Sequence, residues 1–453
     1  MSSSIRIIDP VYFNNTRSAE FRLDEENTAY LTSGMYLALG AEGANATVNA
    51  VGYNRKAGVA SLVSAIRLLD GGTVLAQLEN AGMWMAWKGT NHDNADAVSK
   101  RAASLASGSL INFHIAEAKT PLIIGHPVTP SIGTLAVDAA DVSLGHIAIK
   151  DFLKELEVLR VLPTVIFDNL RLQVDFTTDV STICNKNATG AGAVSALKAV
   201  RPILVCDVVK DPATIAAMVS SMSQMSFTGI ESDRFLLPEI TTGRTTHIQT
   251  LRGFNNKVVN RVLIANQPTD PVQGVVQTNT DGGGAVTLEM LSAGKLNSLA
   301  QNRYTVNCRV NGASVFPGRG LGYDETYGST TKVGAGYNHR LGILTDTWGD
   351  VSLCQGSNTC GLVCKDLTSG DAINQQVLAN DVGQIFFGQD YTGFKVMDRV
   401  SHLELSISRS FVATANAPNM NAGTTNQAIN QFVYAEVPKT LQIMNGAYRV
   451  AYL

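Results

Sequence analysis

The chain carries few charged side chains for its length. Of its 453 residues only 16% are charged, against about 25% in a typical soluble protein, and the net charge is −3. No run of five like charges occurs, so neither a basic nucleic-acid-binding surface nor an acidic tail is expected. Ala, Ser, Thr, Asn and Gly take the place of charge, as in residues 40–49 and 413–430. This composition indicates an exterior that faces other protein over much of its area.

Long apolar runs and cysteines are scarce too. No apolar window reaches the length of about 18 residues that a membrane helix needs, and residues 121–149 are broken by Pro and Asp, so no transmembrane segment is expected. The first residues lack a basic stretch followed by an apolar one, so no cleaved signal peptide is expected. Six cysteines are too few for a disulfide scaffold and fit a reducing compartment.

Motifs for catalysis or metal binding are missing. The histidines stand apart, without H-x-H or H-E-x-x-H pairs, and are interpreted as structural: His92, His114, His126, His146, His247, His339 and His402. No G-x-S-x-G elbow occurs, and the glycines at 318–322 and the Gly294-Lys295 pair lack the context of a phosphate-binding loop. The sequence therefore predicts no enzyme, no catalytic residue, no metal and no cofactor.

Three cysteines form the one cluster of possible ligands. Cys354, Cys360 and Cys364 are spaced as C-x5-C-x3-C, which differs from the C-x2-4-C pairs of zinc sites. Free thiols in a loop are the favoured interpretation, and a disulfide or a metal site stays open as an alternative.

The chain shows alternation with a period of two. Apolar and polar residues alternate from Asn169 to Phe176, which predicts a half-buried strand, and residues 303–310 and 403–407 repeat the pattern. Weaker strand signals lie at 20–24, 29–39, 61–69, 203–209, 247–251, 258–265 and 448–453. Glycine-rich turns separate them, at 70–72, 281–284, 311–312 and 317–320. These patterns predict an all-β sandwich or barrel.

Few helices are expected. Asp211-Pro212 provides an N-cap followed by proline, and apolar residues at helical spacing extend the predicted helix to about Met225. Further helices are predicted at 73–87, 149–156 and 287–299, and long surface loops at 321–336 and 413–427. The first of these helices carries Trp84 and Trp87. It is interpreted as a crossover packed within its own domain, with a subunit contact as the alternative.

Two pairs of segments suggest an internal duplication. Residues 162–176 align with 397–409 when Leu170, Leu172 and Val174 are set on Leu403, Leu405 and Ile407, and residues 61–69 align with 257–265. If the duplication is real, the boundary falls near Ser226. The expected domains are an N-terminal arm at 1–17, a first β domain at 18–225 and a second at 226–453.

Several blocks resemble the major capsid proteins of polinton-like viruses, adintoviruses and related double-stranded DNA viruses. Residues 61–81 with 85–88 are similar to that family's strand, Asp-Gly turn and following block, and residues 15–23 before Tyr30-Leu31 are similar to its opening. Residues 304–317 resemble its V-N-G…P hairpin. The resemblance implies a double jelly roll, two tandem eight-stranded sandwiches with a few short helices.

The same resemblance implies a function. The chain is expected to be a structural subunit of the virion, assembled inside the host cell, whose pseudo-hexagonal homotrimers tile an icosahedral shell. Neighbouring capsomers and the penton and minor capsid proteins are the implied partners, without sequence-specific nucleic-acid binding. The segment 1–16 is a candidate arm toward neighbouring subunits, with a frayed terminus as the alternative.

Two other functions stay open. One is a penton or minor coat protein. The other is a carbohydrate-binding or hydrolytic β protein, whose sign would be a Trp-lined cleft that also bears carboxylates.

Overall fold

The computed structural model describes part of the chain. The described residues are 4–44, 57–90, 145–179, 196–222, 224–239, 243–268, 304–316, 320–322, 391–411, 428–444 and 447–453, with short pieces at 53, 104–105, 112–113, 183, 186–188, 277–278, 285–288, 343–344 and 346–348. Within them, strands dominate and helices are short. None of these helices is long and apolar enough to cross a bilayer.

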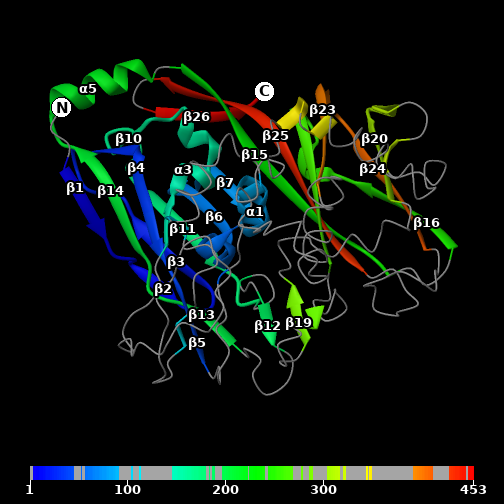
Figure 1. The fold of residues 1–453 in the computed structure, drawn as a ribbon. Coiled ribbons are helices and arrows are strands. Elements are labelled where there is room, and N and C mark those ends of the chain that lie inside the picture. The colour runs from blue at the N-terminus through cyan, green and yellow to red at the C-terminus, as the bar shows by residue number, and fades with distance from the viewer. Residues whose placement is uncertain are drawn as a thin grey trace, which may run out of the picture.

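The first half of the chain folds into two facing sheets (Figure 1). One has the order β1 (Ser4–Ile8), β14 (Ile203–Val209), β4 (Ala29–Leu39) and β10 (Val161–Pro163), with β9 (Gly145–Ala148) also paired to β4. The other has the order β2 (Tyr12–Asn14), β3 (Ser18–Arg22), β11 (Leu170–Phe176), β6 (Val63–Asp70) and β7 (Thr73–Glu79).

The second half repeats the arrangement. One sheet has the order β15 (Gln224–Leu237), β25 (Ile429–Met444), β17 (Lys257–Pro268) and β23 (Tyr391–Val400), with β26 (Ala447–Tyr452) on β25. The other has the order β16 (Gly243–Thr250), β24 (Leu403–Phe411), β20 (Tyr304–Val310) and β21 (Ala313–Ser314), with β22 (Leu321–Gly322) on β20. Figure 1 shows the two halves side by side, with β15 and β25 running between them.

The strand orders of the two halves are identical. To compare the halves, we number eight strands of each from one to eight along the chain. In the first half these are β1, β3, β4, β6, β7, β10, β11 and β14. In the second half they are β15, β16, β17, β20, β21, β23, β24 and β25. Each half then has the sheet orders 1-8-3-6 and 2-7-4-5. Such crossing orders arise from Greek-key connections and define the jelly roll, here present twice.

This topology tests the predicted duplication. The seventh strands, β11 and β24, correspond, so the alignment of Leu170 with Leu403 is confirmed. The alignment of residues 61–69 with 257–265 is wrong, because β6 is a fourth strand in the 2-7-4-5 sheet while β17 is a third strand in the 1-8-3-6 sheet. The counterpart of β6 is β20. Both segments are apolar, and apolar strands from different sheets resemble one another.

The predicted arm is folded onto the first half in the single chain. β1 pairs antiparallel along β14, from Ser4 opposite Val208 to Ile8 opposite Leu204, and β2 pairs with β3. Phe13 packs edge-on against Phe176 with ring centroids 6.4 Å apart. The described part of residues 1–17 therefore forms strands of the first jelly roll.

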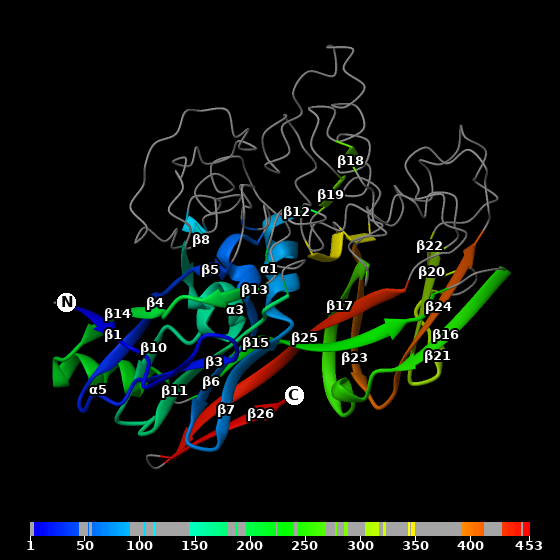
Figure 2. The same cartoon turned by 90° about the horizontal axis from the view of Figure 1, so that it is seen from below.

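Two small sheets lie outside the sandwiches. β12 (Lys186–Ala188), β19 (Ala285–Leu288) and β18 (Gln277–Thr278) form one, and β13 (Ala196–Ala199), β5 (Ala41–Ala44) and β8 (Asn112–Phe113) form the other. Figure 2 shows both at the side of the molecule opposite to the turn between β6 and β7. They extend from one end of the sandwiches, where jelly rolls vary in loop length.

The helices differ in part from the predictions. α5 (Pro212–Ser221) starts at the predicted place, with Asp211 accepting a hydrogen bond from the Thr214 N–H at 3.0 Å, but ends before Met225. The predicted helix at 149–156 is divided into α3 (Ile149–Phe152) and the 3₁₀ turn η2 (Lys154–Glu157), because Leu153 is extended. Two more 3₁₀ turns are η1 (Gly58–Leu62) and η3 (Arg252–Phe254).

The helix predicted at 73–87 is wrong for its first half. Residues 73–79 form β7, which pairs with β6 through a turn containing Gly71 at φ +55°, and α1 (Ala81–Thr90) starts only after Asn80 at φ +54°. Of the predicted helix at 287–299, residues 287–288 belong to β19 and the rest lies outside the described residues. The loop predicted at 321–336 begins with β22, and the loop at 413–427 lies outside the described residues.

Corresponding core leucines provide a stability test of the duplication. Leu172 on β11 and Leu405 on β24 are completely buried, each in its own hydrophobic core. Replacing either by Ala is expected to cost about 2–5 kcal/mol of unfolding free energy, because a cavity remains. Urea unfolding followed by circular dichroism measures the loss. Gln173→Ala and Ser406→Ala, outward on the same strands, are controls, and a leucine variant as stable as its control would contradict the assignment.

Candidate functional site

The predicted site residues do not come together. The described residues contain no group of three or more His, Cys, Asp or Glu side chains that could hold a metal ion. His146, His247 and His402 lie on β9, on β16 and before β24. The remaining predicted positions lie outside the described residues: His92, His114, His126, His339, Cys354, Cys360 and Cys364.

Two described cysteines are buried and chemically quiet. Cys206 on β14 and Cys308 on β20 are free thiols that point into the two cores. Burial raises the pKa of each thiol to about 12, so neither forms a thiolate at neutral pH.

All three tryptophans are buried. Trp87 is 1% exposed, Trp84 4% and Trp348 8%. Trp84 on α1 packs against Trp348 and Tyr434 of the second half, with ring centroids 6.0 and 5.4 Å apart. α1 packs against η1, β6 and α3 of its own half, as interpreted from the sequence, and through Trp84 it also packs against the other jelly roll of the same chain. None of the three can stack on a sugar ring from solvent.

The junction between the halves is also rich in hydrogen bonds. The Tyr434 hydroxyl donates to the Asn80 carbonyl at 2.7 Å, and the Ser232 hydroxyl donates to the Glu79 carbonyl at 3.0 Å. At the other end, the Tyr448 hydroxyl of β26 donates to Asp70 Oδ2 at 2.8 Å. These bonds tie the second half to β7 and to the turn before it, so the junction has a defined geometry.

A buried charge cluster crosses the same junction. Lys439 on β25 lies with Nζ 3.0 Å from Glu155 Oε1 on η2 and 3.1 Å from Glu231 Oε1 on β15. Glu155 is completely buried, and Lys439 and Glu231 are nearly so. Burial works to lower the pKa of Lys439, but Glu155 and Glu231 together raise it, so its ammonium group stays charged.

A second ionic group lies nearby. Glu436 Oε2 is 2.5 Å from Lys154 Nζ and 2.6 Å from a terminal guanidinium nitrogen of Arg261, whose guanidinium also stacks on Trp348 at 4.1 Å from the ring centroid. Burial works to raise the pKa of Glu436, but these cations outweigh it and lower the pKa. The charges of this weakly charged chain are thus concentrated in part between its halves.

The outer face of the first 1-8-3-6 sheet carries a row of exposed and half-buried apolar side chains, with Asp207 and His146 on the same face. Ile7, Val205, Tyr36 and Ala148 lie opposite one another in register across β1, β14, β4 and β9, and we call these four residues the apolar row. Ile7 is 70% exposed and Tyr36 39%, and Val205 and Ala148 are half-buried. Ile5, also 70% exposed, extends the face along β1. In Figure 1 this sheet lies at the left edge, with no other sheet beyond it.

Ion pairs help to hold β1, the edge strand of this face, in place. Arg6 on β1 forms an ion pair with Glu25, and Lys210 pairs with the same carboxylate at 2.5 Å. Hydrogen bonds from Arg6 and Lys210 lower the pKa of Glu25 to about 2. The pairs therefore persist over the pH range in which proteins are usually studied.

The corresponding face in the second half is covered. Tyr434 of β25 lies opposite Leu263 of β17, and Phe432 lies opposite Ala265, as Val205 lies opposite Tyr36 in the first half. These four second-half residues belong to the hydrophobic core of the first half. One chain thus contains the same sheet face twice, once covered by the other jelly roll and once open.

The outer face of the second 2-7-4-5 sheet is polar but weakly charged. On β16, β24 and β20 the residues that point away from the core are mainly hydroxyl and amide side chains: Thr246, Ile248, Thr250, Glu404, Ser406, Ser408, Thr305, Asn307 and Arg309. Ile248 at its edge strand is 62% exposed. Removing water from such a face costs less free energy than removing it from a face that carries many charges.

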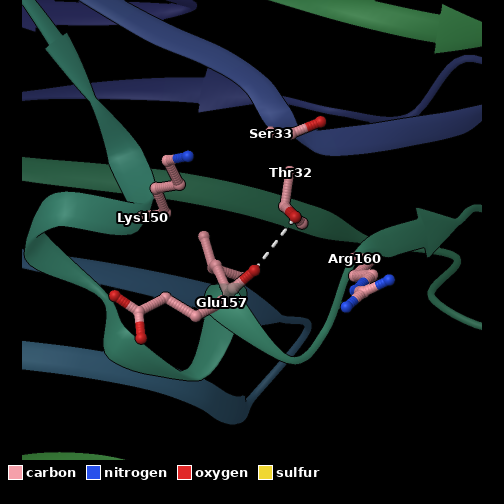
Figure 3. A pocket seen from close by; sticks show the side chains of 6 residues that line it. Thr32, Ser33, Lys150, Glu157 and Arg160 are labelled. Carbon is pink, nitrogen blue, oxygen red and sulfur yellow. Dashed lines mark hydrogen bonds between the residues drawn. The ribbon is translucent and has the colours of Figure 1, made fainter.

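A hollow of 520 Å³ adjoins the apolar row. β9 and β10 pair with different parts of β4, and the hollow lies between them. It is lined by Thr32, Ser33, Lys150, Leu156, Glu157 and Arg160 (Figure 3). The Thr32 hydroxyl donates to the Leu156 carbonyl at 3.0 Å, closing its floor. Lys150, Glu157 and Arg160 point in different directions in Figure 3, so they do not form one catalytic group.

Comparisons with known proteins give a consistent result for the fold. No family model matches the chain, and no curated protein matches its sequence. Among solved structures, the crystal structure of PBCV-1 VP54 fitted into a reconstruction of the virophage Sputnik has a TM-score of 0.57 at 13% identity, over 100% of this chain and 97% of that one.

Two further structures agree. The quasi-atomic model of the PBCV-1 virus capsid has a TM-score of 0.53 at 12% identity, covering 100% of this chain and 97% of that one. The cryo-EM structure of the Sputnik virophage also has a TM-score of 0.53, at 9% identity, over 100% and 88%. Together with the two sandwiches of identical strand order, these likenesses show that the chain has the double jelly-roll fold.

Proposed function

We propose that the chain is a viral major capsid protein whose copies associate into homotrimeric, pseudo-hexagonal capsomers that tile an icosahedral shell. The observation that carries this proposal is the apolar row, an exposed sheet face whose counterpart in the second half is buried by the neighbouring jelly roll. The structures of similar fold come from virus particles, which supports the same conclusion.

The fold suggests how copies meet. If the second jelly roll of one copy packs on the first jelly roll of the next as the two halves pack within a chain, the apolar row becomes covered. Within the chain the first half contributes β7, α1 and η2 to the junction, so the corresponding region of the second jelly roll, beside β21, is the surface brought to it in this arrangement. Burial of Ile5 and Ile7 contributes about 2–3 kcal/mol for each side chain, and a ring repeats the contact at every junction. A permanent interface of this kind is expected to be large and partly apolar.

Other properties follow from the proposed role. The protein is a structural subunit rather than an enzyme, it resides in the virion, and contacts between capsomers and with penton and minor capsid proteins are smaller and more polar than those within the trimer. The proposed domains are 1–223 and 224–453 instead of 18–225 and 226–453, because β1 and β2 are strands of the first jelly roll and β15 begins at Gln224. The apolar side chains of β1 serve the subunit contact instead of a free arm.

The mass of the purified protein in solution tests the proposal. Size-exclusion chromatography with light scattering is expected to give three times the chain mass of 48.2 kDa, and electron microscopy of concentrated samples is expected to show shells or hexagonal arrays. A stable monomer at micromolar concentration would contradict the proposal, because an apolar interface of this size does not dissociate in that range.

A further inference from the structure

The junction between the two jelly rolls contains one carboxyl group with too few partners. Glu155 accepts a hydrogen bond from Lys439 on Oε1, but its Oε2 atom is buried and has no hydrogen-bond partner among the described residues. A Cβ atom placed on Gly229 would lie 2.3 Å from Glu155 Oε1 and 2.8 Å from Lys439 Nζ, so the surrounding backbone is closely packed. The carboxyl group therefore has little freedom to move toward solvent.

The charges around Glu155 come from four strands of the second half. Lys439 of β25 and Glu231 of β15 face it directly. Behind them, the Tyr452 hydroxyl of β26 donates to Glu231 Oε1 at 2.8 Å, and Lys257 Nζ of β17 lies 3.6 Å from Glu231 Oε2. Glu231 thus has three hydrogen-bond donors or cations near its carboxyl group, whereas Glu155 pairs with Lys439, which it shares with Glu231.

These different surroundings shift the pKa values of the two carboxyl groups in opposite directions. Burial works to raise the pKa of Glu231, but Lys439 and Lys257 outweigh it and lower the pKa. Burial raises the pKa of Glu155, with the nearby charge of Glu231 acting in the same direction, and Lys439 and the backbone N–H of Glu155 compensate only in part. Two coupled carboxyl groups whose surroundings favour opposite protonation states share protons as a unit.

We propose that Glu155 is a proton-controlled latch between the two jelly rolls: the junction is tight while Glu155 carries a proton and loosens when this buried carboxyl group ionises. The proton removes a negative charge that Lys439 already shares with Glu231. Ionisation leaves Oε2 as an unpaired anionic oxygen in a space without solvent, where η2 of the first half meets β15 and β25 of the second.

The sign of the pH effect follows from the direction of the shift. A carboxyl group with a raised pKa in the folded state stabilises that state below its unfolded pKa, about 4.3 for Glu, and this contribution is lost as the pH rises through the folded value. The unfolding free energy of the wild-type protein is therefore expected to fall as the pH rises from about 4.3 to the folded-state pKa of Glu155, with a slope that corresponds to about one proton.

Glu155→Gln tests the latch, since it is neutral at every pH and nearly isosteric. The assembled protein is unfolded in urea across a pH series, and the fluorescence of Trp84 and Trp348, which both lie at the junction, is followed in parallel without denaturant. In Glu155→Gln we expect the one-proton slope and any matching fluorescence transition to vanish, with the variant more stable than wild type at the alkaline end. Equal pH profiles of variant and wild type would overturn the proposal.

Glu231→Gln is the matched control. Its carboxyl group is held as an anion, so its loss is expected to destabilise the protein at neutral and alkaline pH, opposite to Glu155→Gln. Infrared spectra of wild type provide a measurement that needs no variant: a carboxylic-acid band that titrates above the ordinary Glu range of about 4.3 supports the latch, and its absence overturns it. These measurements concern the junction within one chain, so their failure leaves the proposed capsid role unaffected.

Discussion

Replacing Ile7 by Asp is expected to convert trimers into folded monomers. Ile7 is 70% exposed in the single chain and lies at the edge of the apolar row, so a carboxylate there costs the fold little. In the proposed trimer the same side chain is buried. The variant loses about 2–3 kcal/mol of apolar burial per contact and must desolvate an unpaired charge, which costs several kcal/mol more. The dissociation constant is expected to rise by about 10³-fold or more.

The mass measured by light scattering over a dilution series checks this result, with circular dichroism to confirm folding. Val165→Asp is the control, because Val165 is 62% exposed but lies in the loop between β10 and β11, at the end of the sandwich. It is expected to remain trimeric. An Ile7→Asp protein that keeps the wild-type mass at every concentration would show that the apolar row is not the subunit contact.

Removing the shared cation at the junction is expected to have the largest effect on stability. In Lys439→Met the methylene stem is replaced closely, but Glu155 and Glu231 are left facing each other without the ammonium group between them. Breaking a buried ion pair on one side typically costs about 3–5 kcal/mol, because the remaining charge stays desolvated. Urea unfolding at neutral pH is expected to show a loss in this range.

Two comparisons separate this effect from a loss of packing. Adding Glu155→Gln to Lys439→Met is expected to restore part of the stability at pH values where Glu155 is ionised, since one of the two unpaired charges then disappears. Arg201→Met removes an exposed partner of Asp9, 3.8 Å away with both side chains more than half exposed, and is expected to change stability by less than about 1 kcal/mol. A Lys439→Met protein as stable as Arg201→Met would contradict the burial of the cluster.

Strands with a regular alternation of apolar and polar residues could be predicted from the sequence, and strands with apolar residues on both faces could not be assigned to a sheet. β11 alternates strictly, from buried Leu170 to buried Phe176, and that pattern predicted both the strand and its match with β24. β6 and β17 carry apolar residues on both faces, which removes the alternation that identifies a face. The alignment of these two strands failed for that reason.

The helix predicted at 73–87 failed for a different reason. The spacing of Leu75 and Leu78 fits a helix, because residues three apart lie on opposite faces of a regular strand. In β7 the register with β6 shifts at Leu75, and both leucines are buried. The turn at Gly71 and the pairing of β7 with β6 are tertiary constraints that override the local pattern. Asn80 at φ +54° then ends the strand, and the helix starts one residue later.

The sequence contains a signal for the apolar row. Residues 203–209 of β14 are apolar on both faces apart from Asp207, which is typical of a strand covered on both sides. In the single chain only the inner face is covered, so the outer face needs a partner. The charge cluster had no such signal, because Lys439 and Glu155 are 284 residues apart and only the fold brings them together.

The presence of one covered and one open copy of the same sheet face makes self-association directional. In the proposed trimer each subunit offers one surface on its second jelly roll and a complementary surface on its first, so successive subunits are related by the rotation that the intrachain junction imposes. Head-to-tail contacts of this kind close into a ring only when that rotation divides a full turn, and otherwise grow into a helical filament. In the proposed assembly the packing of Trp84, Tyr434 and Lys439 therefore contributes to whether subunits close into a ring or grow into a filament.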